Sequence, residues 1–326
     1  MSYIELINNL LIPKVTEEAI VLDLFAGCGG LSLGFEAAGF RTVGYEMNPD
    51  AAATYNANLK GNCFVEKITL DFEYPAAQII IGGPPCQPFS VGGNQKGNDD
   101  SRNGFPLFVD AIRKVKPKVF VFENVRGLLY SNKWYLELII KELESIGYKT
   151  NCRLLNAVNY GVPQNRERFF LVGHNADFEF PETENKQYTV HNAIYDLIGT
   201  VPEESKFLTP AQDVYISNYE KASKCINPRD LYPDKPARTL TCRNLSAATG
   251  DMQRVKLPDG RRRRLLIREA ARLQSFPDSF EFTGAPASQF YQIGNAVPPL
   301  LAYKIALAVK ACYSNIKIIR RQLELI

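Results

Sequence analysis

Between residues 20 and 173, short apolar runs alternate with stretches whose apolar residues recur every three or four positions, and this alternation restricts the fold more than any other feature of the chain. The short runs are typical of buried strands, and the longer stretches are typical of amphipathic helices. The expected strands lie at residues 20–25, 42–46, 78–83, 118–124 and 168–173. Strands that alternate with helices form a mostly parallel sheet with helices on both faces, so we predict a doubly wound α/β domain.

The pattern changes between about residue 174 and residue 289, where prolines recur and polar residues dominate. We therefore expect a catalytic domain built from residues 1–173 and 290–326, and a smaller irregular domain at residues 174–289. Within that stretch, residues 221–272 carry 14 Lys and Arg against 5 Asp and Glu, on a chain whose net charge is only +3. A basic segment on a nearly neutral protein indicates a polyanionic partner, although a solvated charged face is the plainer alternative.

The cysteine and histidine content argues against a metal site or a disulfide framework. The seven cysteines include no C-x-x-C pair and the chain has two histidines, so a reducing, cytoplasmic location is expected. No run of eighteen apolar residues is present, and the N-terminus lacks the features of a signal peptide, so no membrane association is expected. Instead, Ser2 and Glu5 form a capping-box pattern, which predicts a short docking helix.

A glycine turn follows the first expected strand, in the sequence DLFAGCGG from Asp23 to Gly30. A strand, a glycine turn and a helix start allow the backbone to approach a ligand, with free N–H groups facing it. The spacing differs from the G-x-G-x-x-G of dinucleotide-binding proteins, which argues against hydride transfer. Glu46 ends the next strand, where such folds bind a ribose. The turn alone could be structural, but together with Glu46 it favours a nucleoside-bearing cofactor.

A single thiol, Cys86, lies in the loop GGPPCQPFS after the strand at residues 78–83. Prolines on both sides restrict how far the sulfur can move, and a partly exposed polar loop favours the reactive thiolate. A lone cysteine is more often a small buried apolar residue, and that interpretation suits Cys63, Cys152 and Cys312. It does not suit Cys86, because a proline-rich loop is poor core material.

Two further polar patterns accompany the expected strands. Glu123, in FENV, ends the strand expected beside the cysteine loop, where a carboxylate could exchange a proton with a heterocycle held against Cys86. Arg166 and Arg168, in QNRERFF, point to one side of an extended segment and offer paired donors to a phosphate or a base carbonyl. Each pattern alone is unspecific, since an acid at a strand end is more often a structural anchor.

Taken in order, the elements DLFAGCGG, GGPPCQPFS, ENV, QNRER and GNAVPP resemble the C5-cytosine DNA methyltransferase family. The resemblance covers most of the chain outside residues 174–255. It implies a Rossmann-like methyltransferase fold with a mostly parallel sheet, plus a smaller irregular target-recognition domain, with double-stranded DNA in the cleft between them. It also implies an enzyme that acts as a monomer and is paired with a restriction endonuclease in a restriction-modification system.

The resemblance implies a covalent mechanism in which Cys86 attacks C6 of a cytosine flipped out of the helix. Glu123 would hydrogen-bond N3 and the amino group of the base, Arg168 would contact O2, and Arg166 would support the cysteine loop. Addition at C6 makes C5 an enamine carbon that can accept a methyl group. Loss of the C5 proton then releases Cys86, and the sequence does not identify the base that removes this proton.

The resemblance also implies that S-adenosyl-L-methionine is the methyl donor and that no metal is needed. The implied cofactor-binding residues come from five elements: Phe25, Gly27, Cys28, Gly29, Gly30, Leu31, Glu46, Met47, Pro85, Leu107, Asn295, Ala296 and Val297. The family usually has an Asp after the third strand that binds the adenine amino group, whereas Lys67 stands there in this chain. Either Asp71, through a shifted loop, or a backbone carbonyl would have to replace that Asp.

DNA contacts are expected on the cysteine loop, on the element PARTLTCRN and on the arginine run at residues 261–264. The residues are Gln87, Ser90, Gly92, Arg238, Thr239, Leu240, Arg243, Arg261 and Arg263. Arginines in such a run suit phosphates better than bases. The glycine-rich residues 91–97 are expected to form a mobile loop that closes over the DNA. The recognised base sequence depends on loop geometry and is not readable from the chain.

Four other protein classes fit the sequence less well. A tRNA cytosine-C5 methyltransferase shares the catalytic set, but the Cys-Phe-Thr signature of RNA members is absent after the arginine pair. A catalytically silent DNA-binding regulator would tolerate the loss of Cys86 or Glu123, and both are present. A nicotinamide oxidoreductase fails on glycine spacing. An amino-methylating enzyme would carry an Asp/Asn-Pro-Pro-aromatic motif in place of Pro-Pro-Cys.

Overall fold

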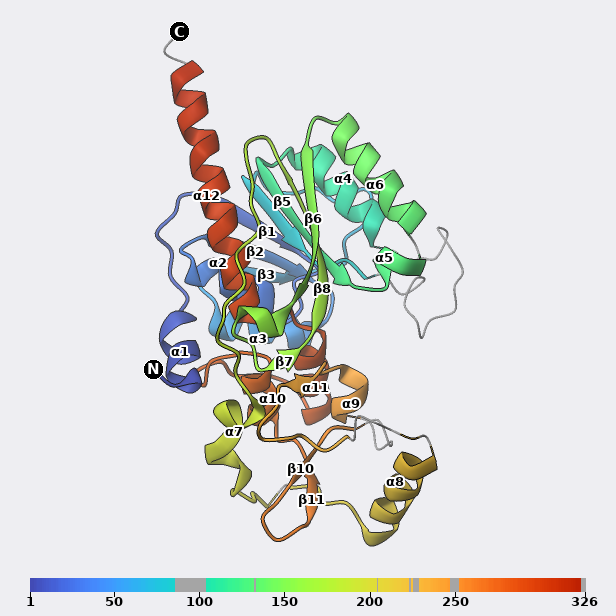
Figure 1. The fold of residues 1–326 in the computed structure, drawn as a ribbon. Helices are drawn as coiled ribbons and strands as arrows, with labels where there is room; N and C mark the ends of the chain where they lie inside the picture. The colour runs from blue at the N-terminus through green and yellow to red at the C-terminus, as the bar shows by residue number, and fades with distance from the viewer. Residues whose placement is uncertain are drawn as a thin grey trace.

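The computed structural model describes residues 1–85, 104–131, 133–203, 205–222, 224, 229–246 and 252–323. At its centre lies a seven-stranded sheet in the order β3-β2-β1-β4-β5-β8-β6 (Figure 1). Its strands are β1 (Ile20–Leu24), β2 (Arg41–Glu46), β3 (Asn62–Val65), β4 (Ile79–Gly82), β5 (Val119–Val125), β6 (Lys149–Asn156) and β8 (Glu167–His174). The strand order reverses between β1 and β4, and α/β sheets bind ligands at such a point.

Six of these strands run parallel to one another, and β8 runs antiparallel to both of its neighbours. All five strands expected from the sequence are present at nearly the expected positions. The sequence pattern did not predict β3 and β6, because each of these edge strands has only one buried residue and lacks a continuous apolar run. It also did not predict the reversal of β8. Only the turn η3 (Ala157–Tyr160) and the short strand β7 (Gln164–Asn165) connect β6 to β8, whereas parallel neighbours need a longer crossover.

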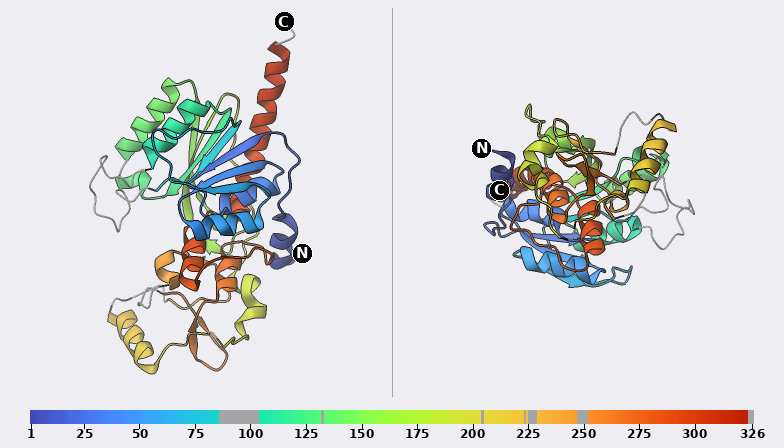
Figure 2. Two further views of the ribbon diagram at one scale, coloured as in Figure 1. Left: turned by 180° about the vertical axis from the view of Figure 1, so that it is seen from behind. Right: turned by 90° about the horizontal axis from the view of Figure 1, so that it is seen from below.

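Helices cover both faces of the sheet, as the alternation predicted (Figure 2). One layer contains α2 (Gly30–Ala37), α3 (Pro49–Asn58) and α12 (Pro299–Leu323). The other contains α4 (Phe105–Val115), α5 (Leu128–Ser131) and α6 (Lys133–Ser145). The side chains of β5 alternate between the layers, because successive residues of a strand point to opposite faces. Val119 and Val121 belong to the buried apolar cluster on the side of α2 and α12, whereas Phe120 and Phe122 belong to the cluster on the side of α4 and α6.

The long helix α12 returns to the first part of the chain and packs on α2, as its length suggested (Figure 1). A Cβ atom at Gly34 would lie 2.5 Å from Cβ of Ala302, so this glycine allows the two helices to approach closely. The span Pro286–Ile316 is long and apolar enough to cross a membrane, but 61% of its most apolar window is buried inside the protein. Packing against α2 and the sheet therefore accounts for its apolar character.

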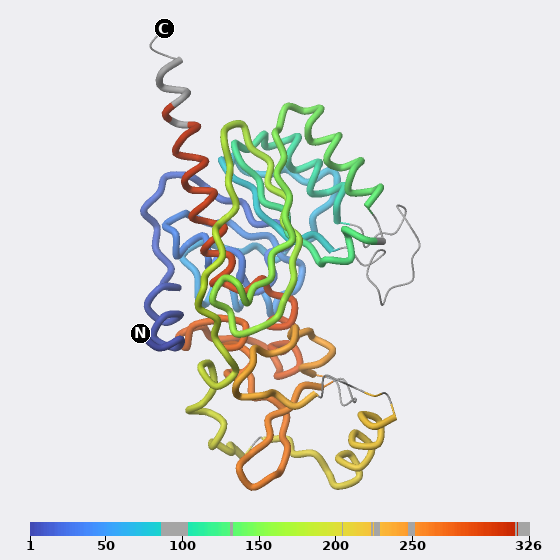
Figure 3. Tube along the Cα trace, viewed as in Figure 1, coloured from blue at the N-terminus to red at the C-terminus, as the bar shows by residue number. Residues whose placement is uncertain are grey.

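The chain between β8 and α12 forms a lower part with little regular structure (Figures 1 and 3). Its strands are β9 (Ala237–Arg238), β10 (Arg254–Lys256) and β11 (Arg262–Arg264). β10 pairs with β11 in an antiparallel hairpin, and β9 pairs with β7 in parallel. Its helices are α7 (Val190–Ile198), α8 (Pro210–Ala222), α9 (Cys242–Ser246), α10 (Ile267–Leu273) and α11 (Pro286–Asn295).

A single buried apolar cluster extends from the sheet into this lower part. It includes Val21 of β1 as well as Leu257, Leu265 and Ile293. The helices α10 and α11 lie between the sheet and the β10–β11 hairpin (Figure 1). The core is therefore continuous across the expected domain boundary, and a division at residues 174 and 289 stays a prediction.

The N-terminal helix α1 (Tyr3–Leu10) begins with the expected capping box. The Glu5 backbone N–H donates to Ser2 Oγ over 3.2 Å, and the Ser2 backbone nitrogen donates to Glu5 Oε2 over 2.8 Å. The buried Tyr3 hydroxyl donates to the carbonyl of Arg272 in α10 over 2.8 Å. The docking function expected of this helix is therefore confirmed.

Candidate active site

The glycine turn connects β1 to α2 at the middle of the sheet edge. Phe25 and Gly29 have positive φ angles of 61° and 86°, and Gly27 has a φ of 55°. The Gly27 N–H donates to Glu46 Oε2 over 2.9 Å, and the Asn48 N–H donates to Glu46 Oε1 over 2.8 Å. The carboxylate of Glu46 is thus fixed between the ends of β1 and β2. Each of its oxygens keeps a lone pair that could accept a further hydrogen bond.

The segment Asn295–Val297 lies directly against this turn. A Cβ atom at Gly30 would lie 2.6 Å from the carbonyl oxygen of Val297 and 3.1 Å from Cβ of Ala296. Only glycine permits this approach, since a contact below 3.0 Å requires one of the two backbones to shift. Ala296 and Val297 are buried, while Asn295 is exposed. Residues from opposite ends of the chain, which the sequence assigned to one cofactor pocket, therefore meet in the structure.

Other residues of the expected cofactor pocket differ in their accessibility. Cys28 is buried, with Sγ 3.7 Å from the carbonyl oxygen of Gln292, and burial raises the pKa of its thiol to about 12. Its side chain is therefore a packing group, and Leu31 is likewise buried in the core. Phe25 and Leu107 are half-buried against the α4 layer. Met47 and Pro85 are exposed.

The loop after β3 contains Lys67 and Asp71, the residues considered for the adenine contact. Lys67 and Asp71 are both exposed, and Ile68 between them is buried. Both polar side chains are accessible to a ligand, and neither forms an ion pair with another described residue. The choice among Lys67, Asp71 and a backbone carbonyl stays a prediction.

Glu123 lies at the end of β5 beside the backbone that leads into the cysteine loop. Its side chain is buried, and its Oε1 lies 3.0 Å from Nε of Arg168. Its other oxygen faces Gly83, where a Cβ atom would lie 2.9 Å from Oε2. The neighbouring Asn124 donates from Nδ2 to the Pro84 carbonyl over 3.0 Å, and this bond fixes the start of the loop.

The described chain stops at Pro85, so several expected site residues cannot be placed. Cys86, Gln87, Ser90 and Gly92 lie outside the described residues, as does the loop at 91–97. The chain resumes at Gly104, whose N–H donates to the carbonyl of Pro85 over 3.0 Å. The two described ends of this segment are therefore joined by a hydrogen bond.

Burial dominates the electrostatics of the Glu123 site. Burial raises the pKa of the Glu123 carboxyl, although the nearby guanidinium groups of Arg168 and Arg166 act in the opposite direction. Burial also lowers the pKa of Arg168, and Glu123 opposes that change. A buried carboxyl with a raised pKa binds a proton more readily than an exposed one, which suits proton donation.

Arg166 has partners other than those expected from the sequence. Its side chain is fully buried, and its guanidinium donates to the carbonyl of Leu240 over 2.6 Å. It also donates to the carbonyls of Gly294 and Ala296, each over 2.9 Å. The expectation was a contact with the cysteine loop, of which only Gly82–Pro85 are described here. Arg166 falls in the break between β7 and β8, and the partners of its guanidinium among the described residues are these three carbonyls. Support of the cysteine loop, most of which lies outside the described residues, stays a prediction.

A cavity of about 390 Å³ adjoins Arg168. Arg168 of β8 and Thr239 after β9 line it together with Asn156 and Asn165. Thr239 donates from Oγ1 to the carbonyl of Asn165 over 2.6 Å, which brings the expected recognition element PARTLTCRN (residues 236–244) next to the arginine pair. Residues that the sequence assigned separately to catalysis and DNA binding therefore share one cavity.

Two of the expected DNA contacts are incompatible with the structure. Leu240 is fully buried, and its N–H donates to Gln164 Oε1 over 2.8 Å, so its side chain cannot reach DNA. Arg263 is also fully buried and forms an ion pair with Glu269 over 2.7 Å. The strand β11 explains this burial, because alternate residues face opposite sides and Arg263 takes the inward one. Arg238 and Arg243 are exposed, as expected.

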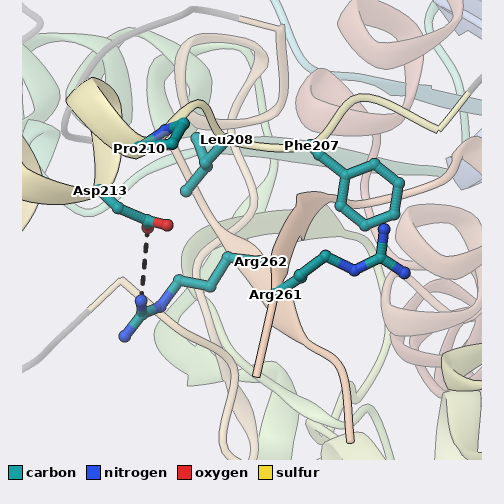
Figure 4. Close-up of a pocket in the computed structure, with 6 residues that line it drawn as sticks. All are labelled: Phe207, Leu208, Pro210, Asp213, Arg261 and Arg262. Atoms are coloured by element: carbon teal, nitrogen blue, oxygen red, sulfur yellow. Dashed lines mark hydrogen bonds and ion pairs between the residues drawn. The ribbon is translucent and has the colours of Figure 1, made fainter. Parts of the chain in front are cut away.

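The other arginines of the run lie at the surface of the lower part. Arg261 pairs with Asp259 over 2.7 Å and lies over the ring of Phe207, 4.4 Å from its centroid. Arg262 pairs with Asp213, and both line a cavity of about 470 Å³ (Figure 4). Arg264 is half-buried, and its guanidinium donates only a long bond, of 3.5 Å, to the Ser246 carbonyl within the described chain. Because alternate residues of a strand face the same side, a strand at residues 262–264 would have indicated Arg264, and not Arg263, as the accessible arginine.

The sheet order, its single reversed strand and the glycine turn after β1 define a Rossmann-like methyltransferase fold. The family model described as C-5 cytosine-specific DNA methylase matches residues 20–311. The chain therefore belongs to the C-5 cytosine-specific DNA methylase family, and it is a DNA cytosine-5-methyltransferase.

Curated relatives match nearly the whole chain. Type II methyltransferase M.AplI of Arthrospira platensis is 56% identical over 322 residues, which cover 97% of this chain and 93% of the relative. Type II methyltransferase M1.HphI of Haemophilus parahaemolyticus is 35% identical over 332 residues, which cover 90% of this chain and 87% of the relative. Both relatives thus resemble this chain along most of its length.

Solved structures support the same fold. A putative DNA modification methyltransferase encoded within an E. coli prophage has a TM-score of 0.69 and 25% identity, and the match covers 91% of this chain and 100% of that one. DNMT2 of Spodoptera frugiperda also has a TM-score of 0.69, at 17% identity, with 88% and 98% of the two chains covered. At that identity the second match supports the fold alone.

Proposed function

We propose that this protein transfers a methyl group from S-adenosyl-L-methionine to C5 of a cytosine within a specific short sequence of double-stranded DNA. The target cytosine is flipped out of the helix and forms a transient bond from C6 to Cys86. The observation that carries this proposal is the Glu123–Arg168 pair, which lies against Gly83 at the start of the cysteine loop. A carboxyl and a guanidinium beside the expected nucleophile match the N3 and O2 edge of cytosine.

The chain's own groups perform the proton and charge steps. Attack of the Cys86 thiolate on C6 places negative charge on the ring, and the Glu123 carboxyl neutralises it by giving a proton to N3. The raised pKa of Glu123 supports this role. The guanidinium of Arg168 donates to O2 and keeps the base oriented. After C5 has been methylated, a base takes the C5 proton, the C6–Sγ bond breaks, and its electron pair returns to the sulfur. N3 gives its proton back to Glu123, so that neutral 5-methylcytosine and the carboxyl group are both restored.

The glycine turn suits a nucleoside cofactor. Gly27 has a positive φ, and a Cβ atom there would meet nothing within 4 Å, so the backbone faces open space. Glu46 beside it can accept the two ribose hydroxyls, and the segment Asn295–Val297 closes the same site. When bound, S-adenosyl-L-methionine supplies an electrophilic methyl group on a sulfonium. No group of three or more potential metal ligands occurs in the part of the chain that the structure describes.

DNA would lie between the sheet edge and the lower part, which we propose to be a target-recognition domain at residues 174–289. Thr239 lines the cavity beside Arg168, and Arg238 and Arg243 are exposed near it in the sequence. Arg261 and Arg264 are candidates for phosphate contacts, whereas the buried Arg263 is not. Phosphate contacts of this kind position a protein on DNA without reading its sequence.

The relatives named type II methyltransferases suggest the biological setting. We infer that the enzyme acts in the cytoplasm as a monomer and protects DNA against a partner restriction endonuclease of the same sequence specificity. A matched test of protection would ask whether plasmid DNA from cells expressing the enzyme resists one restriction endonuclease and not others.

The test of the reaction uses tritiated S-adenosyl-L-methionine and plasmid DNA, followed by bisulfite sequencing. Wild-type protein is compared with Cys86→Ser and with Cys152→Ser, which removes an exposed thiol of β6. The proposal predicts C5 methylation within one short sequence for the wild type and for Cys152→Ser, and none for Cys86→Ser. Transfer to tRNA in place of DNA would support the tRNA methyltransferase alternative. Failure of the wild type on both acceptors would support the silent regulator.

A further inference from the structure

Three segments that are far apart in the sequence meet at a buried polar network, which we call the Arg166 network. It consists of the side chains of Gln164, Arg166 and Gln274 and the backbone groups that they bind. Arg166 donates to the Leu240 carbonyl, which belongs to the recognition element, and to the Gly294 and Ala296 carbonyls, which precede α12. One guanidinium therefore connects the recognition element to the cofactor side of the site.

The two glutamines reinforce the same connection. Gln164 accepts from the Leu240 N–H over 2.8 Å and donates to Gln274 Oε1 over 2.5 Å. Gln274 in turn donates from Nε2 to the carbonyls of Ile293 and Ala296, over 3.1 Å and 2.7 Å. Leu240 and Ala296 are thus each bound twice by the network.

Both ends of the network touch functional elements. Thr239, which lines the cavity beside Arg168, precedes Leu240 in the chain. Ala296 lies on Gly30, the first residue of α2 after the glycine turn. The network therefore joins the expected cofactor site to the expected DNA site through the interior of the protein. One connection uses the Arg166 side chain alone, and the other uses Gln164 and Gln274.

Burial makes this connection rigid. Arg166 is fully buried and forms no ion pair in the described chain, so carbonyl oxygens carry the solvation of its charge. Removing one partner from a buried charged group leaves part of its charge without compensation. A shift of the segment at Ala296 therefore breaks a hydrogen bond of Arg166, the same side chain that binds the Leu240 carbonyl.

We propose that Arg166 is a positioning residue that couples cofactor binding to DNA recognition. A ligand that orders the segment Asn295–Val297 against Gly30 would also order Thr239–Leu240, and DNA bound at Thr239 would in turn favour the ligand. Such coupling is reciprocal, because each ligand must change the affinity of the other by the same factor. The inference rests on the proposed function for the identity of the two ligands.

The experiment measures the affinity of each protein for a duplex that the wild type methylates, with and without saturating S-adenosyl-L-homocysteine. The ratio of the two dissociation constants is the coupling factor, and allosteric factors are about 5- to 150-fold in general. We expect at least about a fivefold factor for the wild type, a factor close to one for Arg166→Met, and partial recovery for Arg166→Lys. Gln274→Leu removes the bonds to Gln164, Ile293 and Ala296, leaves those of Arg166 in place, and serves if Arg166→Met fails to fold.

The matched control is Arg268→Met. Arg268 of α10 also donates to two backbone carbonyls, those of Pro277 and Phe280, over 3.1 Å and 3.0 Å. Among the described residues it forms no hydrogen bond with Leu240 or Ala296. It should lose stability and keep the wild-type coupling factor. A wild-type factor of one, or an unchanged factor in Arg166→Met or Gln274→Leu, would overturn the coupling while methyl transfer to DNA continued. Absence of methyl transfer in the wild type would instead overturn the proposed function.

Discussion

Arg168 Nε lies 3.0 Å from Glu123 Oε1, and both side chains are nearly inaccessible to solvent. The pair crosses from β8 to β5, which are adjacent antiparallel strands, and Glu123 stands opposite Phe170 in the register. The reversal of β8 therefore brings an arginine from the start of one strand to the carboxylate at the end of its neighbour. A parallel β8 would have placed Arg168 at the opposite edge of the sheet.

Replacing Glu123 by Gln is expected to abolish most of the activity. An amide in place of the carboxyl keeps the shape of the site but cannot give a proton to N3, and general acid catalysis contributes about 10²- to 10⁴-fold to a rate. We therefore expect kcat to fall by about 10²-fold or more, with little change in DNA affinity, measured by tritium incorporation and by DNA titration. Glu142→Gln, which removes a surface ion pair with Arg113, is the control. A Glu123→Gln variant within threefold of wild type would contradict the assignment.

Replacing Gly30 by Ala is expected to weaken cofactor binding without unfolding the protein. The added Cβ would lie 2.6 Å from the Val297 carbonyl, so the Asn295–Val297 segment must move away from the turn. We expect the dissociation constant for S-adenosyl-L-homocysteine to rise about tenfold or more, which corresponds to about 1.4 kcal/mol, as measured by calorimetric titration. Gly199→Ala meets nothing within 4 Å and should bind like the wild type. Equal affinity of the two variants would refute the role of this contact.

The free energy of unfolding should fall as pH rises toward neutrality, because the buried Asp23 carboxyl then ionises. Burial raises its pKa to about 7, against the hydrogen bond from Ser32 Oγ, whereas the pKa of an Asp in the unfolded chain is 3.8. Because the folded state holds this proton more tightly, the stabilisation is complete below the unfolded pKa and is lost as pH rises through the folded pKa. Between these values, the free energy of unfolding should fall by up to about 1.4 kcal/mol per pH unit. Urea unfolding of wild type and Asp23→Asn at pH 5, 6 and 7 measures the difference, and parallel pH profiles would show that Asp23 does not titrate in this way.

Replacing Arg263 should lower the stability of the protein, whereas replacing Arg261, two positions away, should weaken DNA binding. Breaking the buried Arg263–Glu269 pair with Arg263→Met should lower the free energy of unfolding by about 3–5 kcal/mol, because it leaves a buried carboxylate alone. Arg261→Met should change stability by only about 0.5 kcal/mol and should reduce the salt dependence of DNA binding by about one phosphate contact. Urea unfolding and DNA titrations at several salt concentrations test both. If Arg263→Met proved stable but defective in DNA binding, the original sequence prediction would be restored.

The sequence alone determined the secondary structure around the site and the identity of the family. The glycine turn, the capping box of α1 and the apolar strands β1, β2, β4 and β5 each follow from residues that are close in the chain. Local patterns of this kind are readable because a strand or a helix start depends on its own side chains and on a fixed period. The order of the motifs by itself points to cytosine methylation.

Only the tertiary structure decided which of several similar side chains are buried. Arg263 and Arg261 look equivalent in a run of four arginines, and Arg166 and Arg168 look equivalent in QNRER. Arg263 and Arg166 are fully buried because distant partners meet them: Glu269 in one case, and the Leu240 and Ala296 carbonyls in the other. The burial of a charge depends on such partners, since without them its desolvation would not be compensated. Those partners are brought together by the fold and cannot be read from the local sequence.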